Sequence, residues 1–521
     1  MEMGTVLGAM EEYTFTFVAM AVGFLVLVHL YEPYWKVRAT GPGPGPCRSS
    51  ATSTCVFPVL AKKHGLSSGP ALGRQPLIIV ADAELCKEVG IKKFKRMPNR
   101  SLPSPIANSQ IHRKGLFATR DSRWSAMRNV IVSIYQPSHL AGLIPTMESC
   151  IERAATTNLD DGEEVIFSKM ALSLATDVIG QAAFAADFGL SGKPAVPDDD
   201  TKGVDDVGDA AKAKASSKFI NMHIHSTTWL KMDLSGSLST ILGTLVPFLQ
   251  KPLRQVLLRV PSSADREITR VNGELRRMAD GLVAACAAER ERAPAASQSQ
   301  QHKDFLSVVL AAKESDASTR ELLSPDYLSA LTYEHLLAGS ATTAFTLSSV
   351  VYLVAKHPEV EENLLREIDT FGPRGTVVKE SMRLFMVSPL VARETSERLE
   401  IGGYVLPKGT WVWMAPGVLA KDPHNFPDPQ LFRPERFEPA GDEQKKRHPY
   451  AFIPFGIGPR VCIGQKFAIQ EIKLAIIHLY QHYVFRHSPS MESPLEFQFG
   501  IVVNFKHGVK LHVIKRHVAC L

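Results

Sequence analysis

The stretch Phe455-Gly-Ile-Gly-Pro-Arg-Val-Cys-Ile-Gly464 decides the fold of this chain and carries most of its functional information. It places one cysteine, Cys462, between glycines and two residues after the permanent cation Arg460. Gly456 and Gly458 permit a tight turn, because glycine adopts backbone angles that a Cβ atom disfavours. A cysteine held beside a fixed positive charge ionises more readily and can bind an iron atom as a thiolate.

The residues after Cys462 favour a helix packed into a core, with apolar side chains at positions 467, 469, 472, 474, 476 and 477. The sulfur would then lie at a helix N-terminus, where free N–H groups and the helix dipole stabilise an anion. A lone cysteine is more often a buried, inert thiol. Here every fixed position of the pattern F-x-x-G-x-R-x-C-x-G is present, which favours a metal ligand.

This run resembles the heme-binding loop of the cytochrome P-450 superfamily, and the resemblance extends over residues 56–521. It implies a mainly α fold with small β-sheets, the cytochrome P-450 fold, behind one N-terminal transmembrane helix. It also implies heme b as the cofactor, Cys462 as the iron ligand, and Phe455 and Gly464 as its neighbours. In such enzymes the thiolate pushes electron density toward the iron and favours O–O cleavage. The implied activity is monooxygenation with dioxygen, using NADPH electrons supplied by NADPH-cytochrome P-450 reductase.

The composition describes a globular chain. Of 521 residues, 45% are hydrophobic and 21% charged, which suits a protein with a large core. The net charge of +6 is dispersed, and without a basic block we expect no nucleic-acid partner. The seven cysteines are irregularly spaced and suggest no disulfide framework, which favours a reducing compartment.

An uncharged stretch at residues 13–31 is long enough to cross a bilayer as a helix. A cleaved signal peptide and a core helix are the alternatives, but acidic residues precede the stretch and no small-residue cleavage site follows. Lys36 and Arg38 come after it, so the positive-inside rule places the body in the cytosol. We therefore expect a lead at 1–12, a single-pass endoplasmic reticulum anchor at 13–31, a linker with a Pro/Gly hinge at 32–55, and the catalytic domain at 56–521.

Glu380 and Arg383 lie three residues apart in a predicted helix. An exposed pair at this spacing is common and contributes only tenths of a kcal/mol. The segment Phe432-Arg-Pro-Glu-Arg-Phe437 follows before the cysteine loop. This order resembles the E-x-x-R helix and the "PERF" segment of the superfamily. The resemblance implies that Glu380, Arg383 and Arg436 form a buried charge network that braces the heme loop.

Ala338-Gly-Ser-Ala-Thr-Thr343 lies within an apolar helix predicted over 325–356. Gly339 removes a side chain and can leave room beside a flat ligand. Thr342 can bond back to a carbonyl or offer its hydroxyl to a ligand, and in isolation the back-bonded form is favoured. The run resembles the oxygen-activating helix A/G-G-x-D/E-T-T, which implies that Thr342 helps to deliver protons to dioxygen.

Ala341 stands where that pattern has an acid. Without the carboxylate, proton delivery has to rely on water, on Thr342 or on the substrate. A second class of function therefore stays open, a heme-thiolate isomerase or dehydratase that needs neither oxygen nor a reductase.

Trp124 and Arg128 are four residues apart and share a helix face. A core tryptophan beside a surface arginine explains this spacing equally well. The resemblance instead implies that both side chains contact a heme propionate, and that Arg393 and Arg460 are further propionate partners. Heme carries two carboxylates, and buried arginines nearby can form ion pairs with them.

Three stretches outside these motifs resemble one plant branch, the carlactone oxidases of the MORE AXILLARY GROWTH type in strigolactone biosynthesis. They are residues 336–349, 388–395 and 488–497. The resemblance implies a small apolar terpenoid substrate, carlactone, oxidised to carlactonoic acid and in some members on to 4-deoxyorobanchol or orobanchol. The expected substrate-contact regions are largely apolar, which suits such a ligand.

Two departures from that branch leave a third alternative, a catalytically impaired paralogue. Only 37 residues separate Thr343 from Glu380, where we expect a longer connection with a further helix. The segment 47–70 lacks the expected apolar helix and the start of the first sheet.

Overall fold

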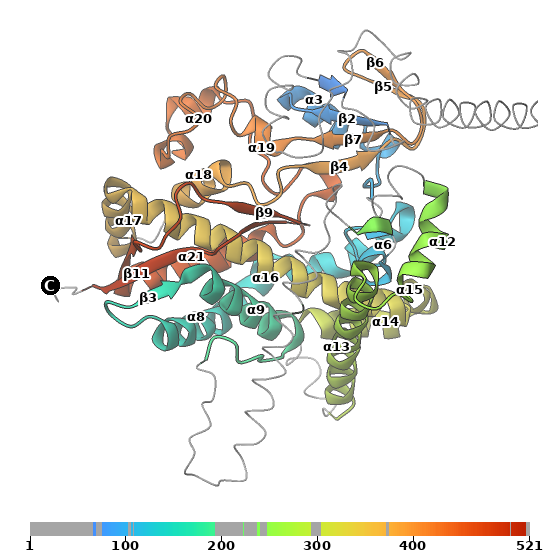
Figure 1. The fold of residues 1–521 in the computed structure, drawn as a ribbon, viewed down its shortest axis with the longest axis horizontal. Helices are drawn as coiled ribbons and strands as arrows, with labels where there is room; N and C mark the ends of the chain where they lie inside the picture. The colour runs from blue at the N-terminus through green and yellow to red at the C-terminus, as the bar shows by residue number, and fades with distance from the viewer. Residues whose placement is uncertain are drawn as a thin grey trace, which may run out of the picture.

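The computed structural model describes residues 66–68, 76–102, 106–107, 109–192, 222, 237–239, 247–292, 304–370, 375–500 and 502–516. Within these ranges the chain is mainly helical with small sheets, which confirms the expected fold class (Figure 1). The predicted anchor at 13–31 and the hinge lie outside the described residues.

A single long helix, α16 (Pro325–Lys356), runs through the middle of the molecule, as predicted (Figure 1). Pro325 occupies its first turn, where proline is favoured, and Pro358 follows its end. Its central residues are almost all buried. Among the described residues it is also the one helix long and apolar enough to cross a membrane, but 78% of that apolar window is buried inside the protein. We therefore interpret α16 as the core helix of the fold.

Other helices surround α16 and bury its sides. Helices α8 (Ile144–Asn158) and α9 (Phe167–Phe184) cover one side, α13 (Ala264–Arg292) crosses it, and α21 (Gln465–His482) and α18 (Thr376–Leu384) pack nearby (Figure 1). The remaining α-helices are α3 (Ala83–Lys87), α5 (Gln110–Arg113), α6 (Asp121–Ile131), α7 (Pro137–Gly142), α12 (Pro247–Leu257), α14 (Phe305–Ser315), α15 (Ala317–Leu322), α17 (Pro358–Thr370), α19 (Pro416–Leu419) and α20 (Asp442–Lys446).

The largest sheet has the order β1-β2-β7-β4 and forms a smaller lobe beside the helices (Figure 1). Its strands are β1 (Leu66–Ser68), β2 (Leu77–Val80), β7 (Trp411–Met414) and β4 (Val391–Glu394). Strand β2 is parallel to β7, and the other two pairs are antiparallel. The smaller sheets are β3-β11-β8 (Glu164–Ile166, Lys510–Lys515, Tyr483–His487), β5-β6 (Leu399–Ile401, Tyr404–Leu406) and β9-β10 (Phe497–Phe499, Val503–Phe505).

The expectation that segment 47–70 lacks the start of the first sheet is wrong. Strand β1 lies inside that segment and pairs with β2 in antiparallel register, Leu66 opposite Val80. A strand of three residues is too short to be recognised from the sequence pattern. Its pairing with β2 is what identifies it as a strand. The short connection before Glu380 contains α17, which lies between α16 and α18.

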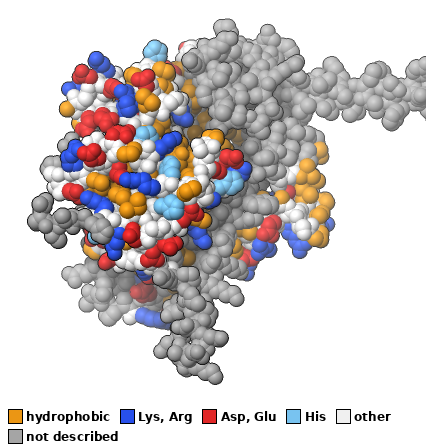
Figure 2. All heavy atoms as spheres, turned by 60° about the vertical axis from the view of Figure 1, so that its left-hand side comes forward, with side chains coloured by type: hydrophobic (Ala, Val, Ile, Leu, Met, Phe, Trp, Pro, Cys, Tyr) orange, Lys and Arg blue, Asp and Glu red, His pale blue; other side chains and the backbone are white. Residues whose placement is uncertain are grey.

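The outer face formed by α17, α20 and the strand β11 carries cationic and acidic side chains interspersed (Figure 2). Exposed pairs such as Arg366–Glu362 at 3.1 Å account for part of this mixture. Among the described residues on this face no patch of a single charge stands out, in keeping with the dispersed charge of the sequence.

Candidate active site

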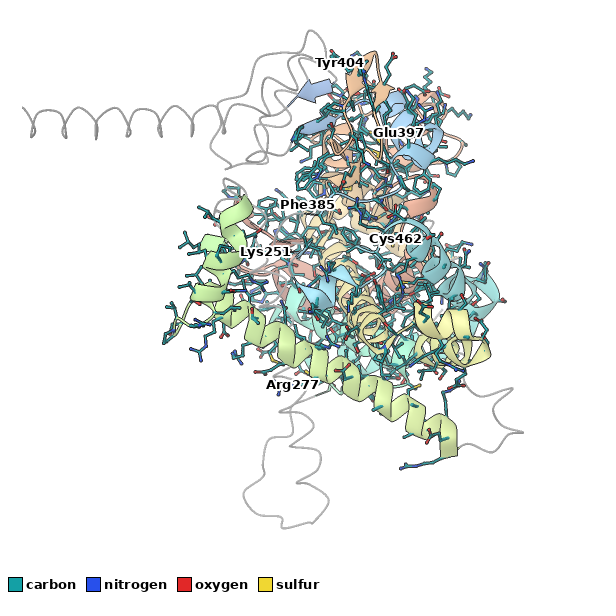
Figure 3. The ribbon with its side chains drawn as sticks, turned by 90° about the vertical axis from the view of Figure 1, so that its right-hand side faces the viewer. Lys251, Arg277, Phe385, Glu397, Tyr404 and Cys462 are labelled. Atoms are coloured by element: carbon teal, nitrogen blue, oxygen red, sulfur yellow. The ribbon has the colours of Figure 1, made fainter. Side chains whose placement is uncertain are left out.

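The cysteine loop lies within the body of the molecule, just before α21 (Figure 3). The Cys462 backbone N–H donates to the Phe455 carbonyl at 2.9 Å, which closes the loop. Gly456 and Gly458 have φ of +78° and +72°, the left-handed region that glycine tolerates. At Gly458 a Cβ would also lie 1.9 Å from the carbonyl oxygen of Gly90, so no other residue fits there.

The Cys462 side chain is accessible, whereas the other described cysteines are buried. Surrounding protein nevertheless raises the pKa of its thiol, while the Gly464 N–H and the cations Arg100 and Arg128 act in the opposite direction. A sulfur that is both accessible and desolvated faces a space inside the fold. The N–H and the two guanidiniums are groups that stabilise a thiolate there.

Four arginines gather around this space, and we refer to Arg100, Arg128, Arg393 and Arg460 as the arginine cluster. Burial lowers the pKa of each of the four guanidiniums, and Arg100 and Arg128 interact electrostatically with Cys462. Arg393 and Arg460 interact with Arg100 instead. The Arg128 Nη2 donates to the Val461 carbonyl at 2.9 Å, and Arg100 Nη2 donates to the Arg460 carbonyl at 3.3 Å. These bonds join the cluster to the cysteine loop.

Aromatic and backbone contacts orient the cluster. The Arg460 guanidinium lies over the Trp124 ring at 4.1 Å from its centroid, and Arg128 lies at 5.9 Å from the same ring. Arg460 Nη2 also donates to the Thr119 carbonyl at 2.9 Å. The Nε atoms of Arg100 and Arg393 are buried and have no hydrogen-bond partner among the described residues. Such donors are costly to leave unpaired, which indicates an anionic ligand.

The structure brings Glu380, Arg383 and Arg436 together with their side chains fully buried. The Glu380 carboxylate accepts from Arg383 Nε at 2.7 Å and Nη2 at 2.8 Å, and from Arg436 Nε at 3.2 Å. It also accepts from the Arg433 backbone N–H at 3.0 Å. Arg383 donates further to the carbonyls of Ala420, Pro429 and Leu431. The network thereby ties α18 to the segment that precedes the cysteine loop.

Helix α16 presents one accessible face in an otherwise buried run, with Glu334, Ala338 and Thr342 spaced four residues apart. The Thr342 hydroxyl donates to the Ala338 carbonyl at 2.6 Å, the back-bonded form. The expectation that Gly339 leaves room beside a flat ligand is wrong. A Cβ there would lie 2.7 Å from Cγ1 of Ile179, so Gly339 allows α9 to approach α16 closely.

The family model for cytochrome P-450 matches residues 53–512, most of the chain. The chain belongs to the cytochrome P-450 family. Among similar proteins, thromboxane-A synthase of Sus scrofa is 25% identical over 88% of this chain and 87% of its own length. Cytochrome P-450 3A9 of Rattus norvegicus is 25% identical, over 98% of this chain and 97% of its own. Cytochrome P-450 3A56 of Fundulus heteroclitus is 26% identical, over 94% and 96%.

Cytochromes P-450 are heme-dependent oxidoreductases, so this chain is an enzyme of that class. The charges beside Cys462 fit heme. The arginine cluster surrounds the thiol with cations, and Glu334 is the carboxylate that interacts electrostatically with Arg100 and Arg460. A thiolate and the two carboxylates of heme are anions that such a group of cations would stabilise. The unpaired Nε donors of the cluster could then bond to those carboxylates.

Two residues of this cytochrome P-450 site were missed by reasoning from the sequence. Arg100 follows Pro98 and Asn99 in an irregular stretch, where nothing distinguishes it from a surface arginine. Glu334 is a charged residue inside an apolar helix, four and eight residues before Ala338 and Thr342, and that pattern could have revealed it.

Glu334 joins the central helix to the loop that precedes α6. Its two carboxylate oxygens accept from the Phe117 backbone N–H at 2.9 and 3.0 Å. A Cβ at Gly115 would lie 1.8 Å from Glu334 Oε2, so this approach requires glycine. Burial raises the pKa of Glu334 from 4.5 to about 7, against the opposing effects of the Phe117 N–H and Arg100. Arg100 in turn lies over the Phe117 ring at 4.1 Å from its centroid.

Proposed function

We propose that this chain is a monooxygenase in which Cys462 binds the heme iron as a thiolate. The observation that carries the proposal is an accessible, desolvated sulfur at the start of α21, next to the Gly464 N–H and the arginine cluster. In this assignment Phe455 would pack against the heme. Heme, when bound, supplies the iron at which dioxygen is reduced and its O–O bond is cleaved.

The propionate partners in this proposal are Trp124, Arg128, Arg393 and Arg460, joined by Arg100. Each guanidinium already has backbone carbonyls to fix its direction, as Arg460 does with Pro98 at 2.9 Å. A fixed cation loses little freedom when it pairs with a carboxylate. We assign to Glu380, Arg383 and Arg436 the structural task of holding the segment that leads to the cysteine loop.

We assign to Thr342 the task of holding a water molecule that delivers protons. Its hydroxyl lies on the accessible face of α16 and donates its hydrogen to the Ala338 carbonyl, so its oxygen is free to accept a hydrogen bond from water. Ala341 offers no carboxylate, so water held at Thr342 is the route that this chain retains. A Thr342→Ala variant should consume NADPH faster than it forms product, because reduced oxygen would escape as peroxide.

We further propose a carlactone-like terpenoid as the substrate. The support is the resemblance of residues 336–349, 388–395 and 488–497 to the carlactone oxidases, and the apolar character of the region around Val391. The animal relatives, at 23–26% identity, favour no particular substrate for this chain. Oxidation of a methyl group to a carboxyl would convert carlactone to carlactonoic acid.

In the same proposal, residues 13–31 anchor the enzyme in the endoplasmic reticulum membrane and an NADPH-dependent reductase docks near Cys462. The test is to co-express the full chain with such a reductase in microsomes, add carlactone and NADPH, and analyse products by mass. A product with a carboxyl in place of a methyl supports the proposal. No oxidised product, from microsomes whose heme is fully loaded, contradicts the substrate assignment.

Ala341 favours one other function, a heme-thiolate isomerase or dehydratase. Such an enzyme would convert its substrate without NADPH and without reductase. Omitting both from the microsomal assay separates the two, because only a monooxygenase then loses all turnover. The third alternative, an impaired paralogue, has less support because strand β1 is present within the segment 47–70.

A further inference from the structure

A cavity of about 220 Å³ lies between α13 and α16. Figure 3 shows α13, with Arg277 labelled, running along one side of the molecule. None of the described residues that line the cavity belongs to the candidate active site. They are Phe188, Leu275, Met278, Ala279, Gly281, Leu282, Thr332, Tyr333 and Leu336.

Thr332 brings an unsatisfied hydroxyl to this apolar wall. Its side chain is fully buried, and its Oγ1 has no hydrogen-bond partner among the described residues. Several other hydroxyls on α16 bond back to a carbonyl one turn earlier, as those of Ser340 and Thr346 do, while Thr343 shares the unpaired state of Thr332 but is not among the described residues that line the cavity. Thr332 makes no such bond, and its hydroxyl lies in the wall of the cavity. A buried hydroxyl without a partner is costly, which suggests that a ligand supplies one.

Water is a poor occupant of this cavity. A buried water molecule needs two to four polar partners, and apart from Thr332 and Tyr333 the lining side chains are apolar. A dry apolar cavity of roughly 150 Å³ is enough to bind benzene. In proportion, about 220 Å³ would accept a molecule of roughly nine non-hydrogen atoms.

Polar contacts tie the two helices to each other beside the cavity. Arg276 of α13 pairs with Asp326 of α16, and the Ser329 hydroxyl of α16 bonds to Asp280 of α13. A shift of α13 along α16 would break these contacts. The cavity is expected to persist in the folded protein.

Gly281 lies at the point where the cavity reaches the surface. It lines the cavity, it is exposed, and a Cβ at this position would meet no heavy atom within 4 Å. Glycine in the middle of a helix is less favourable than alanine, so Gly281 lowers the stability of α13. The opening offers a small molecule a route to Thr332.

We propose that this cavity is a binding site for a small apolar molecule that carries a single hydroxyl group, such as a phenol or a compact terpenoid alcohol. The ring or hydrocarbon part contacts Leu275, Met278 and Leu336, and the hydroxyl bonds to Thr332 Oγ1. The site is independent of the function proposed for the heme side. Binding in this cavity is therefore expected even if the enzyme acts on a different substrate at the heme.

The test uses purified full-length holoprotein and 4-ethylphenol, which has nine non-hydrogen atoms, with 4-ethyltoluene as its hydroxyl-free counterpart. Calorimetry counts the bound molecules, and the heme absorbance recorded in parallel reports those that lie beside the heme. We expect one bound 4-ethylphenol that leaves the heme absorbance unchanged. Thr332→Val keeps the shape of the side chain and should weaken this binding about tenfold while leaving 4-ethyltoluene unaffected.

Gly281→Leu should narrow the cavity at its exposed residue and weaken the 4-ethylphenol binding that leaves the heme absorbance unchanged. The matched control is Gly273→Leu on the same helix, where a Cβ also meets nothing within 4 Å but the residue does not line the cavity. This control should bind as the wild type does. The proposal is overturned if every bound molecule perturbs the heme, or if neither Thr332→Val nor Gly281→Leu changes the binding.

Discussion

Replacing Glu380 by alanine should be among the most damaging single changes in this enzyme. The carboxylate accepts four hydrogen bonds, of 2.7 and 2.8 Å from Arg383, 3.2 Å from Arg436 and 3.0 Å from the Arg433 backbone. Its loss leaves two guanidiniums, both with side chains 0% exposed, without their shared counterion. Breaking a buried ion pair in this way costs about 3–5 kcal/mol.

That cost is a large part of the total stability of a folded protein, which is about 5–15 kcal/mol. We therefore expect Glu380→Ala to unfold at a much lower urea concentration than the wild type and to contain little heme. Glu380→Gln keeps an acceptor without the charge, so it should lie between the two. Stability is read from the unfolding midpoint, and heme content from the absorbance of heme per mole of protein.

Glu362→Ala is the matched control. Glu362 pairs with Arg366 at 3.1 Å on α17, but the two side chains are 77% and 66% exposed, so the change should cost less than about 1 kcal/mol. If Glu380→Ala proves no more harmful than Glu362→Ala and retains normal heme, the assignment of Glu380 to a buried bracing network is wrong.

Three further outcomes are expected. Arg100→Leu should weaken heme retention about tenfold or more, since a hydrogen bond to a charged group contributes about 1.5–3 kcal/mol, measured as heme transfer to a competing acceptor. Gly339→Ala should cost about 1–3 kcal/mol by overpacking against Ile179, and adding Ile179→Ala should recover part of the loss in urea unfolding. Because burial raises the pKa of Glu334 from 4.5 to about 7, the folded chain retains a proton that the unfolded chain releases. The wild-type free energy of unfolding should therefore fall relative to that of Glu334→Gln as pH rises from about 4.5 to 7, and the two should run parallel above pH 7.

The sequence predicted the parts of this enzyme that short-range patterns determine. The apolar run from Pro325 to Lys356 gave the bounds of α16, and the cysteine loop with its apolar periodicity predicted α21. The spacing of Glu380 and Arg383 likewise predicted a shared helix, which the structure contains as α18. In each case the residues that define the element lie within a few turns of one another.

Features that depend on distant partners were not predictable in this way. Gly339 was interpreted from its place in a motif, but its neighbour Ile179 comes from a helix 160 residues earlier in the chain. Arg100 approaches Cys462 only because the chain folds back on itself. Strand β1 consists of three residues that acquire their conformation from β2. Such contacts carry no local signal, since burial and pairing are set by the tertiary structure.

The absorbance spectrum of the reduced, carbon-monoxide-bound enzyme tests the central claim most directly. If the Cys462 thiolate binds the heme iron, the wild type should show the red-shifted Soret band of a thiolate-ligated heme, and Cys462→Ala should lose it. A Cys462→Ala protein that keeps the same band and the same heme content would contradict the account.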